Sequence, residues 1–583
     1  MDNKLLIKSA VLTGFVCFAV AVAVFSMRAQ LVGTRKGQPD ENYVKSENCL
    51  ACHEDHFASW RRTYHSRMTQ EARPGTVQGD FEKNNTLEYL GFKARMEKRG
   101  GQFFMNFTTP EGRSETVKIE RTIGSRRIEQ YVGQKNGQYS RLPVAYDLMQ
   151  KRWMNLNGSF FYPDNDNFNR LATQWDTNCV FCHNVKAQPN FSFQTKLAKT
   201  EVAELGIACG ACHGQGAEHI EAASSPVTRA LWNFDGRADT KIVNPRKLDT
   251  DRSMMICAHC HGQRVPEPLD RIREVMVADP FDPGEDLAQF YRPVRPDTQV
   301  GNTSFANHFW ADGGPRLTAH EYQGLTDSAC FTKAQAGRRI NCLSCHELHG
   351  GDVNGNITEE KRTNQACTEC HQNYADAGVL AKHTGHRIDS TGSSCYACHM
   401  PEVVYGVMSF HPTHRITVPD PAATAANNSP NACNQCHVDK SVNWSIAQAK
   451  TLWPERYKNA QPSADAQFDV AEGVRGLFAG DALVRALMAD AMTRRGDLNW
   501  AAPYLVEAFA GDNYPIVRYF AANGLAVAHR ELAKPDYLGD QKARAEQIAP
   551  FFGTIDAARQ KEIKQVADRL RAVRKDVDIE VGE

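Results

Sequence analysis

The sequence predicts a mainly α-helical fold with extensive loops, a small insertion of β-hairpins and a C-terminal domain of helical repeats. Eight copies of the motif Cys-x-x-Cys-His lie between residues 49 and 437, in short segments rich in glycine and proline. In one long gap between motifs, Phe103, Met105 and Phe107 alternate with polar residues, which indicates β-strands. After Pro462 the cysteines stop, and apolar residues recur every three or four positions, as in amphipathic helices.

The repeated motif indicates covalent attachment of haem c. Each thiol pair adds across the two haem vinyl groups, and the histidine that follows is the first axial ligand of the iron. The sequence therefore predicts eight haem groups. The predicted attachment residues are Cys49, Cys52, Cys179, Cys182, Cys209, Cys212, Cys257, Cys260, Cys342, Cys345, Cys367, Cys370, Cys395, Cys398, Cys433 and Cys436, and the predicted proximal ligands are His53, His183, His213, His261, His346, His371, His399 and His437.

Three other uses of these cysteines fit the pattern less well. Structural zinc gives no reason for a histidine directly after every cysteine pair, and a thioredoxin-like redox motif would occur once. Only Cys17 and Cys330 lie outside the motifs, so the sequence offers no disulfide framework. Haem attachment is the remaining interpretation.

Length and composition limit the class of protein. A chain of 583 residues is long enough for two to four domains. Its 68 basic residues balance its 68 acidic residues, so no net charge favours a nucleic-acid partner. The hydrophobic content of 42% is modest, and haem would supply apolar core in addition.

The N-terminus predicts export. Residues 1–28 place two lysines before an uncharged run, Ala10 to Met27, whose eighteen residues span about 27 Å as a helix, close to the ~30 Å hydrocarbon core. The run is either a membrane anchor or a cleaved signal peptide. The anchor is favoured, because cleavage after Ala29 would place bulky Met27 at the third position before the cut. Since haem c is attached outside the cytoplasm, we expect a periplasmic or extracytoplasmic protein tethered to the cytoplasmic membrane.

Composition also predicts the domain boundaries. Residues 29–45 are polar and contain Gly33, Gly37 and Pro39, so they are expected to form a linker. Residues 46–445 would form the octahaem domain, with a β-rich insertion at about 85–165 whose turns include Asn136-Gly137. Residues 463–583 would form a HEAT-like helical domain, which either caps the haem domain or docks a partner.

The second axial ligands decide the chemistry. A second histidine completes the iron coordination and suits electron transfer, whereas an open position lets substrate bind. Of 20 histidines, twelve are not predicted proximal ligands, and of these His56, His259 and His529 are poor candidates by position. Nine candidates for eight irons favour mostly bis-histidine coordination. The predicted distal ligands are His65, His219, His308, His349, His383, His386, His411 and His414, with His320 the weakest candidate.

At these residues the chain resembles a known family. Cys209 to His219, Cys342 to His349, Cys395 to Pro401 and Asn431 to His437 are similar to exported multihaem cytochromes with doubled Cys-x-x-Cys-His motifs, related to the tetrahaem cytochrome c of ammonia oxidisers. The resemblance covers about residues 45–445, and many members end in helical repeats. It implies a core of closely stacked haem pairs and distal ligation by His219 and His349. The chain lacks the Cys-x-x-Cys-Lys variant of pentahaem nitrite reductases, so nitrite reduction by that device is not expected.

These observations predict an electron carrier more than an enzyme. The expected function is electron transfer through eight haems between redox partner proteins that the sequence does not identify. One alternative is an oxidoreductase that acts on a small nitrogen or sulfur compound at a five-coordinate haem, with His320 or His56 supplying protons. Another is a subunit that assembles a larger respiratory complex, a homo-oligomer or a haem filament.

Overall fold

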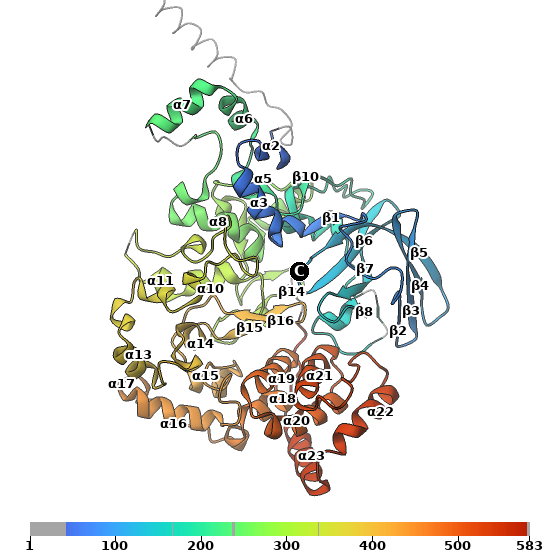
Figure 1. The fold of residues 1–583 in the computed structure, drawn as a ribbon, viewed down its shortest axis with the longest axis vertical. Helices are drawn as coiled ribbons and strands as arrows, with labels where there is room; N and C mark the ends of the chain where they lie inside the picture. Colours follow the sequence, from blue (N-terminus) through green and yellow to red (C-terminus); the bar gives the residue numbers. More distant parts are fainter. Residues whose placement is uncertain (1–41, 166, 169, 236–238, 336, 580–583) are drawn as a thin grey trace, which may run out of the picture. The chain divides into compact units, whose positions relative to one another are not determined.

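The computed structural model describes residues 42–579, except 166, 169, 236–238 and 336 (Figure 1). Residues 1–41, which hold the predicted anchor or signal peptide and most of the predicted linker, lie outside the described residues. Within the described part of the chain, no helix is long and apolar enough to cross a membrane. The chain divides into two compact units. The described part of the smaller one comprises residues 42–44, 215–235 and 239–241, with helices α6 (Ala217–Ala223) and α7 (Pro226–Asp235).

An eight-stranded antiparallel sheet dominates the first third of the larger unit (Figure 1). Its strands follow the chain in the order β2 to β8, and β1 pairs with β5. The first and last strands of this order, β2 and β8, also contact each other, so the sheet is nearly closed. The strands are β1 (Thr69–Glu71), β2 (Thr86–Tyr89), β3 (Phe92–Arg99), β4 (Gln102–Thr108), β5 (Ser114–Ile123), β6 (Ile128–Lys135), β7 (Gln138–Asp147) and β8 (Arg152–Asn155).

This sheet corrects the predicted fold class. A mainly α fold with a small hairpin insertion is wrong, because the structure is 41% helical and 18% strand. Strand β4 alternates as expected, with Phe103, Met105 and Phe107 buried, and Asn136 and Gly137 form the tight turn between β6 and β7 with positive φ angles of 50° and 77°. In contrast, β6 and β7 are buried along most of their length. Strands covered on both faces lose the alternation that would have marked them in the sequence.

The haem-motif segments form short helices and hairpins separated by loops. In the described part of the chain, four two-stranded antiparallel sheets accompany them: β9 (Asn184–Gln188) with β10 (Glu201–Leu205), β11 (Arg264–Pro266) with β12 (Tyr291–Pro293), β13 (Gln299–Val300) with β14 (Thr303–Ser304), and β15 (Glu402–Gly406) with β16 (Ser409–Pro412). The helices are α2 (Glu47–Leu50), α3 (Glu54–Arg62), α4 (Val180–His183), α5 (Cys209–His213), α8 (Thr250–His261), α9 (Ile272–Val275), α10 (Glu321–Asp327), α11 (Ala329–Thr332), α12 (Gln365–Thr368), α13 (Ala377–Thr384), α14 (Cys395–His399), α15 (Pro421–Asn427), α16 (Val442–Leu452) and α17 (Pro454–Tyr457).

The C-terminal helices share one hydrophobic core with the sheet. They are α18 (Glu472–Ala479), α19 (Ala482–Arg495), α20 (Leu498–Gly511), α21 (Pro515–Ala528), α22 (Gln541–Phe552) and α23 (Ala557–Arg571). Aspartates at 481, 497, 540 and 556 accept hydrogen bonds from the first-turn N–H groups of α19, α20, α22 and α23, which fixes where these helices begin. The core runs without a break from Met105 and Trp153 in the sheet to Leu487 and Phe509 in the helices. The helices are therefore integrated with the sheet.

Candidate haem-attachment sites

Each Cys-x-x-Cys-His motif forms a single helical turn. In five motifs the histidine N–H donates to the carbonyl of the first cysteine at 2.8–3.1 Å, as between His437 and Cys433, and the motifs of α5, α8 and α14 lie within helices. One turn of helix brings the first cysteine and the histidine onto the same side. None of the seventeen described cysteines forms a disulfide. The local backbone thus presents two thiols and an imidazole together at each motif.

Five of the proximal histidines face a second imidazole from another part of the chain. The ring centroids of these pairs lie 6.0–6.3 Å apart. In four pairs the ring planes are within 28° of parallel, and in the pair of His261 with His65 they differ by 69°. The pairs are His261 with His65, His213 with His349, His346 with His414, His399 with His383, and His437 with His386.

This spacing fits an iron between the two rings. A bond between a transition metal and an imidazole nitrogen is about 2.0–2.1 Å, and the ring centroid lies a little over 1 Å behind the nitrogen, so two axial imidazoles have centroids roughly 6 Å apart. Rings in direct stacking contact would lie closer, as His56 and His349 do at 4.5 Å. The five pairs therefore have the geometry of axial ligand pairs of a haem iron.

The second ring nitrogen of several of these histidines is already bonded to the backbone. His213 Nδ1 contacts the Val243 carbonyl, His346 the Gly355 carbonyl and His399 the Thr417 carbonyl, each at 2.7 Å. On the distal side, His386 Nδ1 contacts the Thr384 carbonyl at 2.7 Å. A carbonyl can only accept a hydrogen bond, so Nδ1 carries the proton and Nε2 keeps its lone pair for a metal.

Burial keeps two of the predicted distal ligands neutral. Burial is the largest cause that lowers the pKa of His65 and of His414, each to about 4. Burial likewise lowers the pKa of His349 and His383. Neutral imidazole is the form that ligates a metal. At neutral pH these side chains are ready to bind iron without losing a proton.

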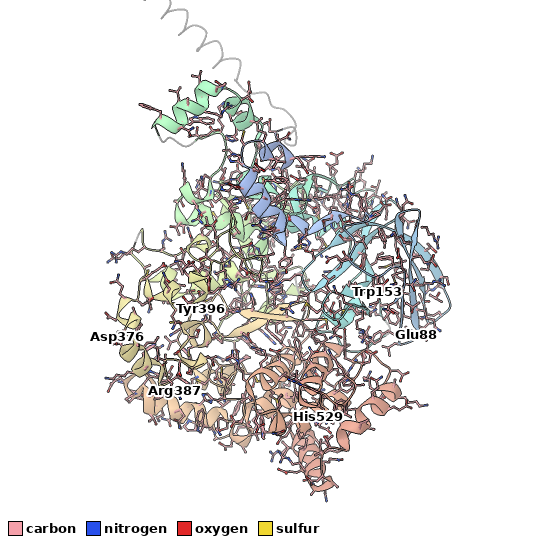
Figure 2. The ribbon with its side chains drawn as sticks, in the orientation of Figure 1. Glu88, Trp153, Asp376, Arg387, Tyr396 and His529 are labelled. Atoms are coloured by element: carbon pink, nitrogen blue, oxygen red, sulfur yellow. The ribbon has the colours of Figure 1, made fainter. Side chains whose placement is uncertain are left out.

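The other three predicted distal ligands, His219, His308 and His411, contact groups other than a proximal histidine. His411 is 3.8 Å from Glu321, and His308 Nδ1 is 2.8 Å from Gln263 Oε1 and its ring packs against His320. His219 Nδ1 contacts Asp239 Oδ2 at 2.6 Å within the smaller unit. Among the described ring pairs, His371 meets Tyr374 and no second imidazole at the 6 Å spacing, and His183 belongs to none of these pairs. His529, which was not expected to bind iron, lies in the C-terminal helical region (Figure 2).

One neighbour of the site, the carboxylate of Glu321, was not predicted from the sequence. Glu321, a half-buried carboxylate of α10, lies 3.7 Å from His261 Nδ1. Against the effect of burial, contact with Glu321 raises the pKa of His261 to about 9. His56 lies parallel to His53 with centroids 6.1 Å apart, but the two are three residues apart at the start of one helix, so helical spacing accounts for this arrangement.

Thiol contacts between motifs give their order in space. The eight motifs are numbered one to eight along the chain. Motif one contacts motif three, and motif two contacts motif four. Motif four also contacts motif five, and motif six contacts motif seven. These contacts are made by cysteine side chains that lie close together, in the pairs Cys49 with Cys209, Cys182 with Cys260, Cys257 with Cys342, and Cys367 with Cys395.

Weaker electrostatic contacts link the remaining neighbours. They join Cys212 with Cys257, Cys345 with Cys367, and Cys398 with Cys433. The motifs thus follow one another in the order one, three, four, five, six, seven, eight, and motif two branches from motif four. No sequence signal could have given this order, because the neighbours are separated by loops of different lengths.

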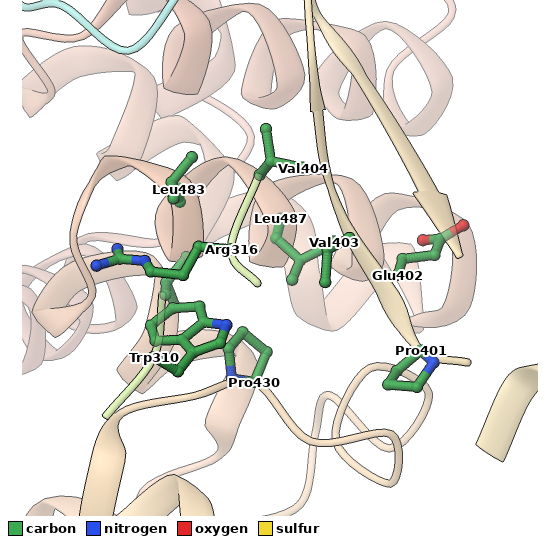
Figure 3. Close-up of a pocket in the computed structure, with 10 residues that line it drawn as sticks. Trp310, Arg316, Pro401, Glu402, Val403, Val404, Pro430, Leu483 and Leu487 are labelled. Atoms are coloured by element: carbon green, nitrogen blue, oxygen red, sulfur yellow. The ribbon is translucent and has the colours of Figure 1, made fainter. Parts of the chain in front are cut away.

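A small cavity lies between β15 and α19 and has no catalytic character (Figure 3). Its lining is mostly apolar and includes Trp310, Val404 and Leu487. The two charged residues of its lining are already paired, Arg316 with Asp481 and Glu402 with Arg494. This cavity therefore offers no free acid or base for chemistry.

Comparison with known proteins supports haem attachment. Residues 334–376 match the family model of the doubled CXXCH motif. The chain is similar to the crystal structure of outer cell wall cytochrome OcwA, with a TM-score of 0.46 and 16% sequence identity over 91% of this chain and 100% of that one, a level that does not by itself establish a shared fold. No curated protein matches the chain. The motif match and the repeated motifs together support a multihaem c-type cytochrome with covalently bound haem c that functions in electron transfer.

Proposed function

We propose that this chain is an octahaem cytochrome c that passes electrons along an ordered row of haem groups outside the cytoplasm. The observation that carries the proposal is the continuous series of contacts that joins all eight motifs. Haem c bound at these motifs would supply one-electron oxidation and reduction. A row of neighbouring attachment sites suits transfer over distance more than reaction at a single site.

In this function the side chains hold and shield the haem groups. Sixteen cysteines anchor them, and the facing imidazoles of five pairs would occupy both axial positions. Carbonyl groups behind His213, His346 and His399 fix the ring orientation. No side chain performs acid or base chemistry.

The same proposal includes the cellular location of the protein and its redox partners. The uncharged run from Ala10 to Met27 would tether the protein to the cytoplasmic membrane, as an anchor that is not cleaved. Redox proteins on either side would act as donor and acceptor. The balance of acidic and basic residues gives no reason for a nucleic-acid partner.

Coulometric titration of the purified full-length protein tests the proposal. Eight haem groups predict uptake of eight electrons per chain on reduction. A variant with both Cys367→Ser and Cys370→Ser should take up one electron fewer, because the sixth motif can then no longer attach a haem. Cys330→Ser is the matched control, since Cys330 lies near Cys370 but outside every motif, and it should match the wild type. Uptake of only one or two electrons by the wild type would refute the proposal.

A second candidate function follows from one observation. Among the described ring pairs, neither His183 nor His371 meets a second imidazole at the 6 Å spacing, so an iron held there could bind a small nitrogen or sulfur compound. Electron paramagnetic resonance of the oxidised protein distinguishes this second function from electron transfer alone. A high-spin haem signal that shifts on addition of nitrite, hydroxylamine or tetrathionate would establish this function, and low-spin signals alone would exclude it.

A further inference from the structure

One proximal histidine differs from the others in what lies behind it. Glu321 is the first residue of α10, and its side chain is 14% exposed. Its Oε2 lies 3.7 Å from Nδ1 of His261, the proximal histidine of motif four. Its Oε1 accepts a hydrogen bond of 3.0 Å from the Thr318 hydroxyl. The carboxylate is therefore held in place directly behind an axial ligand.

Other proximal histidines meet a neutral partner at the same nitrogen. The Nδ1 atoms of His213, His346 and His399 each contact a backbone carbonyl at 2.7 Å. A carbonyl carries a partial charge, whereas an ionised carboxylate carries a full one. Motif four is thus set apart by a half-buried negative charge behind its histidine.

We propose that Glu321 lowers the reduction potential of the haem attached through Cys257 and Cys260 by holding a negative charge behind its axial ligand His261. The oxidised haem would carry one more positive charge than the reduced haem, and a carboxylate 3.7 Å from the outer nitrogen of the ligating imidazole stabilises that charge through the ligand. A carboxylate behind a ligating histidine also makes the imidazole a stronger donor to the metal. Both effects favour the oxidised state.

Motif four has three neighbouring motifs, so the Glu321 charge would act at a branch point of the electron-transfer path. Cys257 contacts Cys212 of motif three and Cys342 of motif five, and Cys260 contacts Cys182 of motif two. Motif four is therefore the junction of three arms. This step rests on the proposed electron-transfer function, in which the junction potential sets how readily an electron passes between the arms.

Glu321 also has a structural role that the test must separate from its effect on potential. An acidic residue in the first turn stabilises a helix, and Glu321 occupies that position in α10. Its other close neighbour, His411, lies 3.8 Å away, and burial lowers the pKa of this histidine. A change of fold would alter the haem content and the reduction potentials of all haem groups. Loss of the Glu321 charge alone should change only the reduction potential of the haem at motif four.

Spectroelectrochemical titration of the full-length protein, followed by electron paramagnetic resonance, tests the inference. The angle between two axial imidazole planes sets the anisotropy of a low-spin ferric haem signal. The ring planes of His65 and His261 differ by 69°, whereas those of the other four pairs differ by at most 28°, so the signal of this haem should be distinguishable from theirs. In Glu321→Gln we expect this haem alone to become easier to reduce, by at least tenfold in equilibrium constant or about 59 mV for one electron.

Two further variants complete the experiment. Asp327→Asn removes a charge from the other end of α10, where Asp327 pairs with Arg295, and should leave this potential unchanged. Glu321→Asp should shift the same haem upward by less than Glu321→Gln, and it serves alone if Glu321→Gln fails to mature. Unchanged potentials with a full haem content would overturn the inference and leave the proposed function intact. A wild-type protein with few haem groups would instead defeat the proposed function.

Discussion

Arg518 of α21 and Asp164, which follows the sheet, form two parallel hydrogen bonds of 2.9 Å. The Arg518 side chain is fully buried, and it also donates to the carbonyls of Asp512 and Tyr537 at 2.9 Å each. A guanidinium presents its donors in a fixed fork that matches a carboxylate. The pair therefore joins the C-terminal helices to the segment that leads from the sheet into the second haem motif.

Breaking this pair should destabilise the protein strongly. In Asp164→Asn the buried Arg518 charge loses its partner, which costs about 3–5 kcal/mol when one member of a buried ion pair is removed. Asp389→Asn breaks an exposed pair with Arg387, whose side chains are 84% and 62% exposed, and should cost less than about 1 kcal/mol. Urea denaturation followed by circular dichroism compares the two. Equal effects of both substitutions would contradict this account.

Two histidines of one hairpin segment should differ in their effect on the haem groups. His414 faces His346 with ring centroids 6.2 Å apart, whereas His411 lies 3.8 Å from Glu321 and its described ring partners are Tyr405 and His414. We expect His414→Ala to add a high-spin signal equivalent to one haem, because one iron loses its sixth ligand. His411→Ala is the matched control and should leave the spin states as they are in the wild type. The pairing is wrong if the two variants give the same electron paramagnetic resonance spectrum.

Stability should fall as pH rises because of Glu129. Burial raises the pKa of Glu129 in β6 to about 7, although Tyr131 and the N–H groups of Gln78 and Gly79 donate hydrogen bonds to it. The folded state therefore binds this proton more tightly than the unfolded state, whose pKa is about 4.5. The stabilisation is complete below that value and is lost as pH rises through about 7. The loss amounts to roughly 3 kcal/mol.

Glu129→Gln should remove this part of the pH dependence. The amide keeps a neutral acceptor for the same donors, as the protonated acid does. Glu88 on β2 is the control, because its side chain is 67% exposed and Glu88→Gln should keep the wild-type profile (Figure 2). Unfolding free energies measured between pH 4 and pH 8 for the three proteins decide the matter. A wild-type slope retained in Glu129→Gln would contradict the assignment.

Removal of the C-terminal helices should abolish haem incorporation. The core is continuous between the sheet and residues such as Leu487 and Phe509, so truncation after Pro462 would expose it. We expect the truncated chain to lose haem content when absorbance per chain is compared with that of the full-length protein. Retention of all haem groups, with loss only of assembly into a larger complex, would instead make the helices a docking module.

The sequence predicts local chemistry better than long-range arrangement. The motifs are visible because haem attachment needs both cysteines and the histidine within one helical turn. His65, His349 and His414 were reasonable ligand candidates from their position near motifs. Which iron each would serve depends on how distant loops meet, and no local pattern records that. His411 and His414 have the same local setting, yet one contacts Glu321 and the other faces His346.

The sheet shows the same limit in another form. Strand β4 has one buried and one partly exposed face, and the alternation of Phe103, Met105 and Phe107 predicted it from the sequence. Strands β6 and β7 are buried on both faces, so their sequences do not show the apolar–polar alternation that marks a half-buried strand. Glu321 could not be identified either, since a glutamate at the start of a helix usually faces solvent. Its contact with His261 exists only in the folded chain.

The central claim is that all eight motifs carry covalently bound haem c. Intact-mass spectrometry of the mature protein, followed by peptide mapping of each motif, tests it most directly. The account predicts eight haem groups, one on every pair of motif cysteines, and none on Cys330. A mature protein with several unmodified motifs would contradict it.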